Sequence, residues 1–164
     1  MNIFARLYRK MFPLVLHGSR YPWTATVEGN DIVVTGQGAT WFGGDDDPQD
    51  DGSTASGMST KSNPQIMGCA LPLDYGTPLS KENPCQGSPL KKIPWFTNVV
   101  VTNRANHASV TVKLIDLGPS APPAANAAID LTQEAFTTLG GDLKAGRLLV
   151  DFRIINGAKL LNLV

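Results

Sequence analysis

Two aspartates beside apolar residues are the side chains in this sequence best suited to acid–base chemistry. Asp116 follows Leu114-Ile115, and Asp130 follows Ala128-Ile129, each at the expected end of an apolar segment. Burial beside such neighbours raises a carboxyl pKa, and a carboxyl that holds its proton can act as the general acid in glycosidic cleavage. The simpler interpretation is that Asp116 closes a turn and Asp130 caps a helix, and spacing alone favours it.

Patterns for nucleophilic, phosphate-binding or metal chemistry are missing from the sequence. The two histidines, His17 and His107, accompany no Gly-x-Ser-x-Gly motif and no cysteine-protease signature. No glycine-rich loop suits a phosphate, and Cys69 and Cys85 lack zinc-ligand spacing. We therefore expect neither a metal nor a cofactor. The two cysteines either form a disulfide, which would contribute about 3 kcal/mol, or stay reduced and half-buried.

An acidic run and a set of aromatic residues offer two further kinds of binding site. The acidic run lies in a polar loop over residues 43–64 and comprises Asp45, Asp46, Asp47, Asp50 and Asp51. It has no EF-hand spacing, so we favour a solvated loop over a calcium site. Aromatic rings can stack on the apolar faces of sugars or fill a core, and the candidates are Trp41, Phe42, Tyr75, Trp95 and Phe96.

Short strands separated by turns must position these side chains. Glycine and proline, 16 and 12 of 164 residues, are typical of many turns between short strands. Apolar alternation and turn residues predict strands over 24–27, 32–36, 38–43, 98–103, 109–116 and 148–155. Residues 133–139 should form a helix that Thr132 caps and Gly140-Gly141 ends, whereas the prolines make 64–94 irregular and 117–127 is a loop. The pattern predicts a mainly β protein, a small β-barrel with one or two short helices and long loops.

Length and charge indicate one neutral domain, over residues 21–164, behind an N-terminal arm over residues 1–20. The arm has helical apolar spacing up to Pro13 and is a candidate contact for a protein partner. With 14 basic and 14 acidic residues, the chain is not expected to bind nucleic acid. No apolar run approaches the roughly 18 residues of a membrane span, and the run over 11–16 is too short for a secretory leader.

Four motifs in the right order resemble the double-psi β-barrel of rare lipoprotein A and the expansins, to which family 45 endoglucanases and barwin are related. The second motif resembles the pattern Leu-Pro-x-Gly-Thr-x-Val-x-Val-x-Asn. The motifs lie at residues 38–43 with 52–57, at 93–103, at 112–119 and at 129–140. Together the motifs lie within residues 36–155, and the resemblance implies a six-stranded double-psi β-barrel.

The resemblance implies an open groove that binds a cell-wall polysaccharide such as peptidoglycan or cellulose. Asp130 would be the key acid, with Asp116 and Thr54 orienting the glycan or a water. The substrate-binding side chains would be Trp41, Phe42, Ser56 and Trp95. The family relationship further implies an extracellular or cell-envelope location.

Two departures from the family pattern limit the expected chemistry. The histidine of the transglycosylases is replaced by Gly68, and the base of the endoglucanases is replaced by Phe42-Gly43. We therefore expect non-hydrolytic binding or weak lytic cleavage at most. The alternative is an inactive structural barrel in a larger assembly, such as a virus particle or a secretion apparatus, which the missing leader and the extra arm favour.

Overall fold

The computed structural model describes residues 14–16, 23–71, 93–119 and 127–164. The expected arm helix, Tyr75 and Cys85 lie outside these residues. In chain order the elements are β1 (Leu14–Leu16), β2 (Trp23–Glu28), β3 (Asp31–Phe42), β4 (Gly68–Leu71), β5 (Asn98–Asn103), β6 (Ser109–Leu117), β7 (Ala127–Thr132), α2 (Gln133–Thr138), β8 (Leu148–Ile154) and α3 (Gly157–Leu160).

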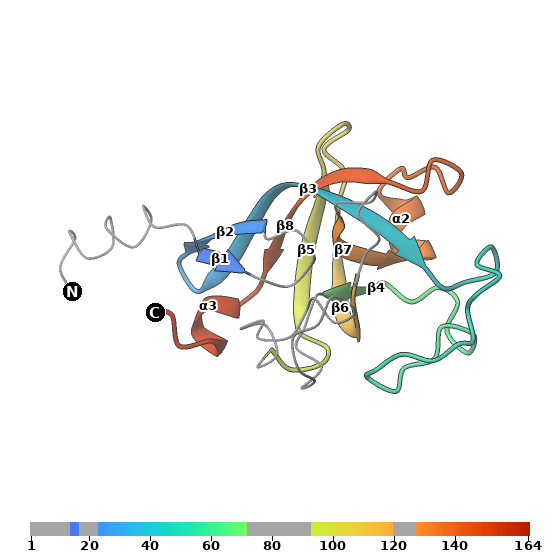
Figure 1. Cartoon of the computed structure of the whole chain (residues 1–164), viewed down its shortest axis with the longest axis horizontal. Helices are drawn as coiled ribbons and strands as arrows, with labels where there is room; N and C mark the ends of the chain where they lie inside the picture. Colours follow the sequence, from blue (N-terminus) through green and yellow to red (C-terminus); the bar gives the residue numbers. More distant parts are fainter. Residues whose placement is uncertain (1–13, 17–22, 72–92, 120–126) are drawn as a thin grey trace.

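Within the described ranges, six strands close into a barrel. Their order is β3-β7-β4-β6-β5-β8, and β8 pairs again with β3 to complete the ring. The β3–β7 and β4–β6 pairs are parallel, and the remaining contacts of the ring are antiparallel. Two parallel pairs in one closed six-stranded ring form a double-psi β-barrel, which confirms the predicted fold class. The β1–β2 ribbon extends from the first half of β3 (Figure 1).

Alternating apolar side chains fill the barrel. β5 buries every second residue, among them Val99 and Val101, and β8 likewise buries Val150, Phe152 and Ile154. Helix α2 adds Phe136, which is fully buried. Each large apolar side chain buried in this way contributes roughly 1.5–3 kcal/mol, so this core holds the strand ends, where polar residues gather, in fixed positions. No helix in the described part of the chain has the length and apolar character needed to cross a membrane.

One predicted strand boundary is wrong. The sequence suggested separate strands over 32–36 and 38–43, but β3 runs through without a break. Gly36 has a φ of 64°, and the pairing of β3 with β8 shifts register between Val34 and Gln37. The Gly36 N–H donates to Asp151 Oδ1 at 2.7 Å. A glycine in the left-handed region therefore bends a single strand instead of ending it.

The segment that forms β4 was expected to be irregular, and β7 was not among the predicted strands. All four residues of β4 are buried, and β7 buries five of its six residues, so neither shows the alternation that marks a strand. The β5–β6 hairpin, β8 and helix α2 are confirmed. Thr132 stands at the N-cap of α2 but makes no side-chain cap. Its hydroxyl instead donates to Ile66 O at 2.6 Å and accepts the Gly68 N–H at 3.1 Å.

Candidate functional site

Strand register brings four residues into one row across the barrel wall. Thr40 on β3 lies opposite Asp130 on β7, Asp130 lies opposite Ala70 on β4, and Ala70 lies opposite Asp116 on β6. We call these four residues the aspartate row. Because neighbouring strands are about 4.8 Å apart, the Cα atoms of the two aspartates are separated by roughly 10 Å. The two carboxyl groups singled out in the sequence thus belong to one site.

Asp130 has the electrostatic environment of a proton donor at neutral pH. Its side chain is half-buried, and Thr40 Oγ1 donates a hydrogen bond to its Oδ1 at 2.9 Å. Burial raises the pKa of Asp130 to about 7, and the negative charges of Asp116 and Asp47 act in the same direction. The hydrogen bond from Thr40 opposes this rise because it stabilises the ionised form. A carboxyl with this pKa exchanges its proton in the range where a general acid is effective.

Thr40→Val should raise the pKa of Asp130 still further. The valine keeps the shape of the threonine but removes the hydroxyl that stabilises the carboxylate. The protonated form of Asp130 is then favoured over the ionised form. A carbon-detected NMR titration of the Asp130 carboxyl measures the change directly. Thr40→Ser, which keeps the hydroxyl, is the control, and an equal shift in both variants would show that the hydroxyl is not responsible.

Asp116 is held by backbone donors from two directions. Its Oδ1 accepts the Leu117 N–H at 2.8 Å and the Ala55 N–H at 3.0 Å. The first bond is local and lies within β6, so Asp116 does not close a turn. The second joins Asp116 to the loop of residues 54–57, 61 positions earlier in the chain. Asp116 therefore anchors this loop beside the aspartate row, and within the described residues no hydrogen bond occupies its second oxygen, Oδ2.

The loop of residues 54–57 carries two of the expected site hydroxyls. Thr54 Oγ1 donates to Met58 O at 2.6 Å and lies 3.1 Å from Ser56 Oγ. The Ser56 N–H donates to Ile115 O at 3.0 Å, which fixes the loop on β6. Thr54 and Ser56 therefore lie next to Asp116, whereas the hydroxyl on Asp130 belongs to Thr40. Thr40 was not singled out as a site residue, although it stands in the 38–43 motif and precedes Trp41.

The expected sugar-binding aromatic residues divide into two groups. Trp41 and Trp95 are partly buried and pack against the core, and Trp41 Nε1 donates to Leu143 O at 3.2 Å. These contacts serve the fold. Phe42 is half-buried. Phe96, in contrast, leaves 45% of its surface exposed.

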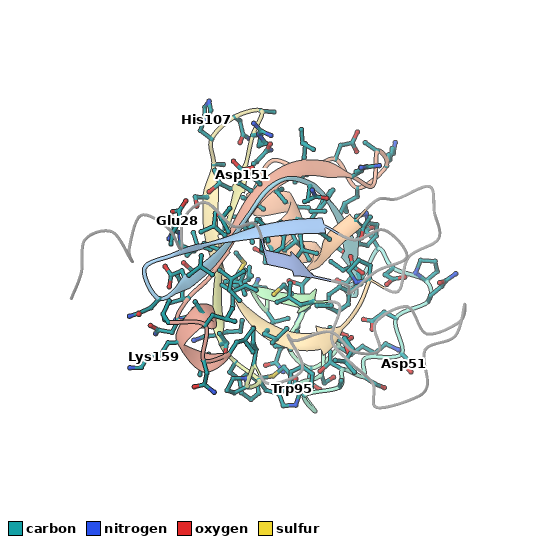
Figure 2. The ribbon with its side chains drawn as sticks, turned by 60° about the vertical axis from the view of Figure 1, so that its left-hand side comes forward. Glu28, Asp51, Trp95, His107, Asp151 and Lys159 are labelled. Atoms are coloured by element: carbon teal, nitrogen blue, oxygen red, sulfur yellow. The ribbon has the colours of Figure 1, made fainter. Side chains whose placement is uncertain are left out.

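The histidine that the resemblance places at position 68 has no counterpart in space. An added Cβ at Gly68 would lie 2.5 Å from Ile115 Cδ1 and 3.1 Å from Thr132 Cγ2, so a side chain there would require Ile115 to shift. His107 is exposed in the β5–β6 turn, at the opposite end of the view from Trp95 and Asp51 (Figure 2). Among the described residues, no histidine accompanies the aspartate row.

The acidic loop uses its carboxylates to hold its own backbone. Asp47 accepts the Gly43 and Gln49 N–H groups, and Asp50 accepts those of Gly44 and Gly52. Burial acts to raise the pKa of Asp50, but hydrogen bonds from Gly52, Thr60 and Gly44 outweigh it and lower that pKa. The loop encloses a pocket of about 300 Å³. No cluster with the composition of a metal site occurs in the described ranges.

Cys69 is a buried free thiol in this structure. Burial raises its pKa, and the charge of Asp130 on the neighbouring strand adds to the effect. Cys85 lies outside the described residues, so the pairing of the two cysteines stays a prediction. A thiol held in its neutral form is a poor nucleophile, so Cys69 contributes packing to the wall behind Asp130.

Comparisons with known proteins match this chain to solved barrels. No protein-family model and no curated protein matches the sequence. A Streptomyces papain inhibitor is similar at 22% identity and a TM-score of 0.45, over 74% of this chain and 94% of that one. The apo expansin of Clavibacter michiganensis is similar at 18% identity and a TM-score of 0.45, over 72% of this chain and 48% of that one. The chain thus spans about half the length of the expansin that it matches.

Proposed function

We propose that this protein binds a cell-wall polysaccharide along the aspartate row and loosens or weakly cleaves it, with Asp130 as the acid. The observation that carries the proposal is a half-buried carboxyl with a pKa of about 7, in register with a second carboxylate. Thr54 and Ser56 lie beside that second carboxylate and offer further hydrogen bonds. A surface of carboxyl and hydroxyl groups suits a neutral ligand rich in hydroxyl and ether oxygens.

The roles of the residues follow from their hydrogen bonds. Protonated Asp130 donates a hydrogen bond to a glycosidic oxygen. Thr40 holds the carboxyl group in place through its hydrogen bond to Oδ1. Asp116, fixed by Ala55 and Leu117, accepts from a sugar hydroxyl or orients a water. Where a bond is cut, the proton of Asp130 passes to the leaving oxygen as the C–O bond breaks. Because no histidine accompanies the row among the described residues, loosening or slow cleavage is the expected outcome.

The test is retention on three insoluble polymers, followed by mass spectrometry of the released sugars. Wild type is mixed with peptidoglycan sacculi, cellulose and chitin, beside Asp130→Asn and the control Asp142→Asn. Asp142 is exposed and bonds only locally to Lys144 N in the structure. We expect wild type and the control to be retained on one polymer. In Asp130→Asn, the loosening or the amount of released sugar should fall by at least about 100-fold if Asp130 is the general acid.

Each outcome decides a part of the proposal. Retention with products that vanish in Asp130→Asn makes the protein a lytic enzyme. Retention without products, together with weakened sacculi or fibres, makes it a loosening protein. Unchanged activity in Asp130→Asn removes Asp130 from the mechanism, and no retention on any polymer overturns the proposal.

A non-catalytic barrel within a larger assembly is the second candidate. The observation that favours it is the packing at position 68, where Ile115 and Thr132 occupy the place of a catalytic side chain. On this alternative the N-terminal arm contacts a protein partner. Failure of wild type to bind all three polymers, with the protein folded, would favour the assembly role. The polysaccharide proposal, in turn, places the protein outside the cell or in its envelope.

A further inference from the structure

Phe96 adopts a backbone conformation that its side chain disfavours. Its φ is 67°, in the left-handed region where a bulky L-residue is a true outlier. The motif that this segment resembles has glycine at the same place, and glycine adopts this φ without strain. The chain therefore carries a phenylalanine where the local geometry calls for glycine.

The fold gains little from the ring in return. The backbone of Phe96 bonds to β6, because its N–H donates to Leu114 O at 2.8 Å while the Leu114 N–H donates to Thr97 O at 3.0 Å. A glycine would make the same bonds. Phe96 is 45% exposed, whereas the neighbouring Trp95 packs against the core. The strained conformation is thus retained in a residue whose large apolar side chain is only partly covered.

No other apolar side chain in the described ranges combines these features. The other large exposed hydrophobic residues are Leu149, Leu160 and Val164, and none of them has a positive φ. The remaining non-glycine residues at positive φ are His107, Asn156 and Asn162, all polar. Strain of this kind concentrates at binding and catalytic sites, where the contact made with a ligand offsets it.

Hydrogen bonds to β6 place the Phe96 turn and the loop of residues 54–57 on the two sides of one stretch of this strand. The Phe96 N–H donates to Leu114 O, the Ser56 N–H donates to Ile115 O, and the Ala55 N–H donates to the Asp116 carboxylate. Because successive carbonyl groups of a strand point to opposite edges, β6 alone separates the Phe96 turn from the loop. Figure 2 shows Trp95 below β6, at the lower edge of the view, with Asp51 of the acidic loop further along that edge. A ligand that extends from Asp116 and Ser56 across β6 would meet Phe96.

We propose that Phe96 is a stacking platform for a sugar ring and extends the glycan-binding surface from the aspartate row past Asp116. The proposal deepens the proposed function and rests on it. The chemistry fits because an aromatic face packs against the apolar C–H face of a pyranose, while the hydroxyls at the sugar edge bond to polar neighbours. Thr54, Ser56 and Asp116 supply such neighbours. The ligand is accordingly an oligosaccharide that spans several sugar units.

The test measures the affinity of soluble oligosaccharides of cellulose, chitin and peptidoglycan by titration calorimetry. Phe96→Gly keeps the backbone conformation and removes the ring, and Phe96→Tyr keeps a stacking face. Leu160→Ser removes an exposed apolar side chain from α3 and serves as the control. We expect about tenfold weaker binding in Phe96→Gly, and binding within about twofold of wild type in the other two variants.

Thermal unfolding separates a binding role from a structural one. If Phe96 is a stacking platform, the melting temperature of Phe96→Gly should lie within about 4 °C of that of wild type or above it, since glycine relieves the strain. A large drop in melting temperature that Phe96→Tyr shares would assign the ring to the fold and overturn the inference. Equal affinity of wild type and Phe96→Gly would also overturn it and leave the proposed function standing. Absence of binding by wild type would overturn both this inference and the proposed function.

Discussion

Asp130→Asn is expected to stabilise the protein relative to wild type above neutral pH, and to do so less at pH 5. In the folded state the pKa of Asp130 is about 7, against an ordinary value of 3.8. Between these values the folded protein holds a proton that the unfolded chain has released. Stability therefore falls as the pH rises through this window and levels off above the folded-state pKa. Asparagine has no such proton, so the variant lacks this dependence.

The expected size makes the effect measurable. From pH 5 to pH 8, wild type should lose about 2 kcal/mol of unfolding free energy more than Asp130→Asn does. Urea unfolding of both proteins at several pH values gives the difference, and Asp142→Asn should follow wild type throughout. A parallel pH dependence in wild type and Asp130→Asn would mean that Asp130 ionises at its ordinary pKa. The proposed acid role would then lose its basis.

Gly68→Ala is expected to destabilise the barrel by about 1–3 kcal/mol. Gly68 is buried in β4 and has no positive φ, so the cause is steric and not conformational. The added methyl would lie 2.5 Å from Ile115 Cδ1 and 2.9 Å from Ile115 Cγ1. Both atoms belong to a fully buried side chain, so the methyl group can be accommodated only if Ile115 changes its packing. Urea unfolding measures the loss.

Ile115→Val supplies a matched rescue because it removes the Cδ1 atom nearest to the added methyl. Alone it should cost about 0.5–1.5 kcal/mol through the lost methyl group. Combined with Gly68→Ala it should recover part of the loss, so that the double variant is more stable than the sum of the single changes predicts. Strict additivity at positions 68 and 115 would contradict the packing explanation.

These two predictions concern opposite aspects of one wall of the barrel. Asp130 on β7 has a half-buried carboxyl group whose ionisation lowers the unfolding free energy at neutral pH. Gly68 on the adjoining β4 leaves room for Ile115 and Thr132, which pack tightly behind it. A destabilising group retained within a well-packed wall is the usual sign that the group serves a purpose other than stability.

The amino-acid sequence by itself determined the regular half of the barrel and its two key carboxyl groups. A run of valines at 99–101 and alternating apolar residues at 110, 112 and 114 specify the two strands of the β5–β6 hairpin. Asp116 and Asp130 stood out because each follows an apolar segment. The motifs around them predicted a double-psi barrel, and the strand pairing confirms it.

Only the tertiary structure decided the rest, because it depends on contacts between distant segments. β4 and β7 are buried on both faces, so their periodicity vanishes and only their pairing shows them to be strands. Thr40 meets Asp130 across 90 residues through the parallel β3–β7 register. The packing of Trp41 and the exposure of Phe96 follow from the finished surface. Sequence spacing fixes which residues share a strand face, but closure of the barrel determines which faces meet.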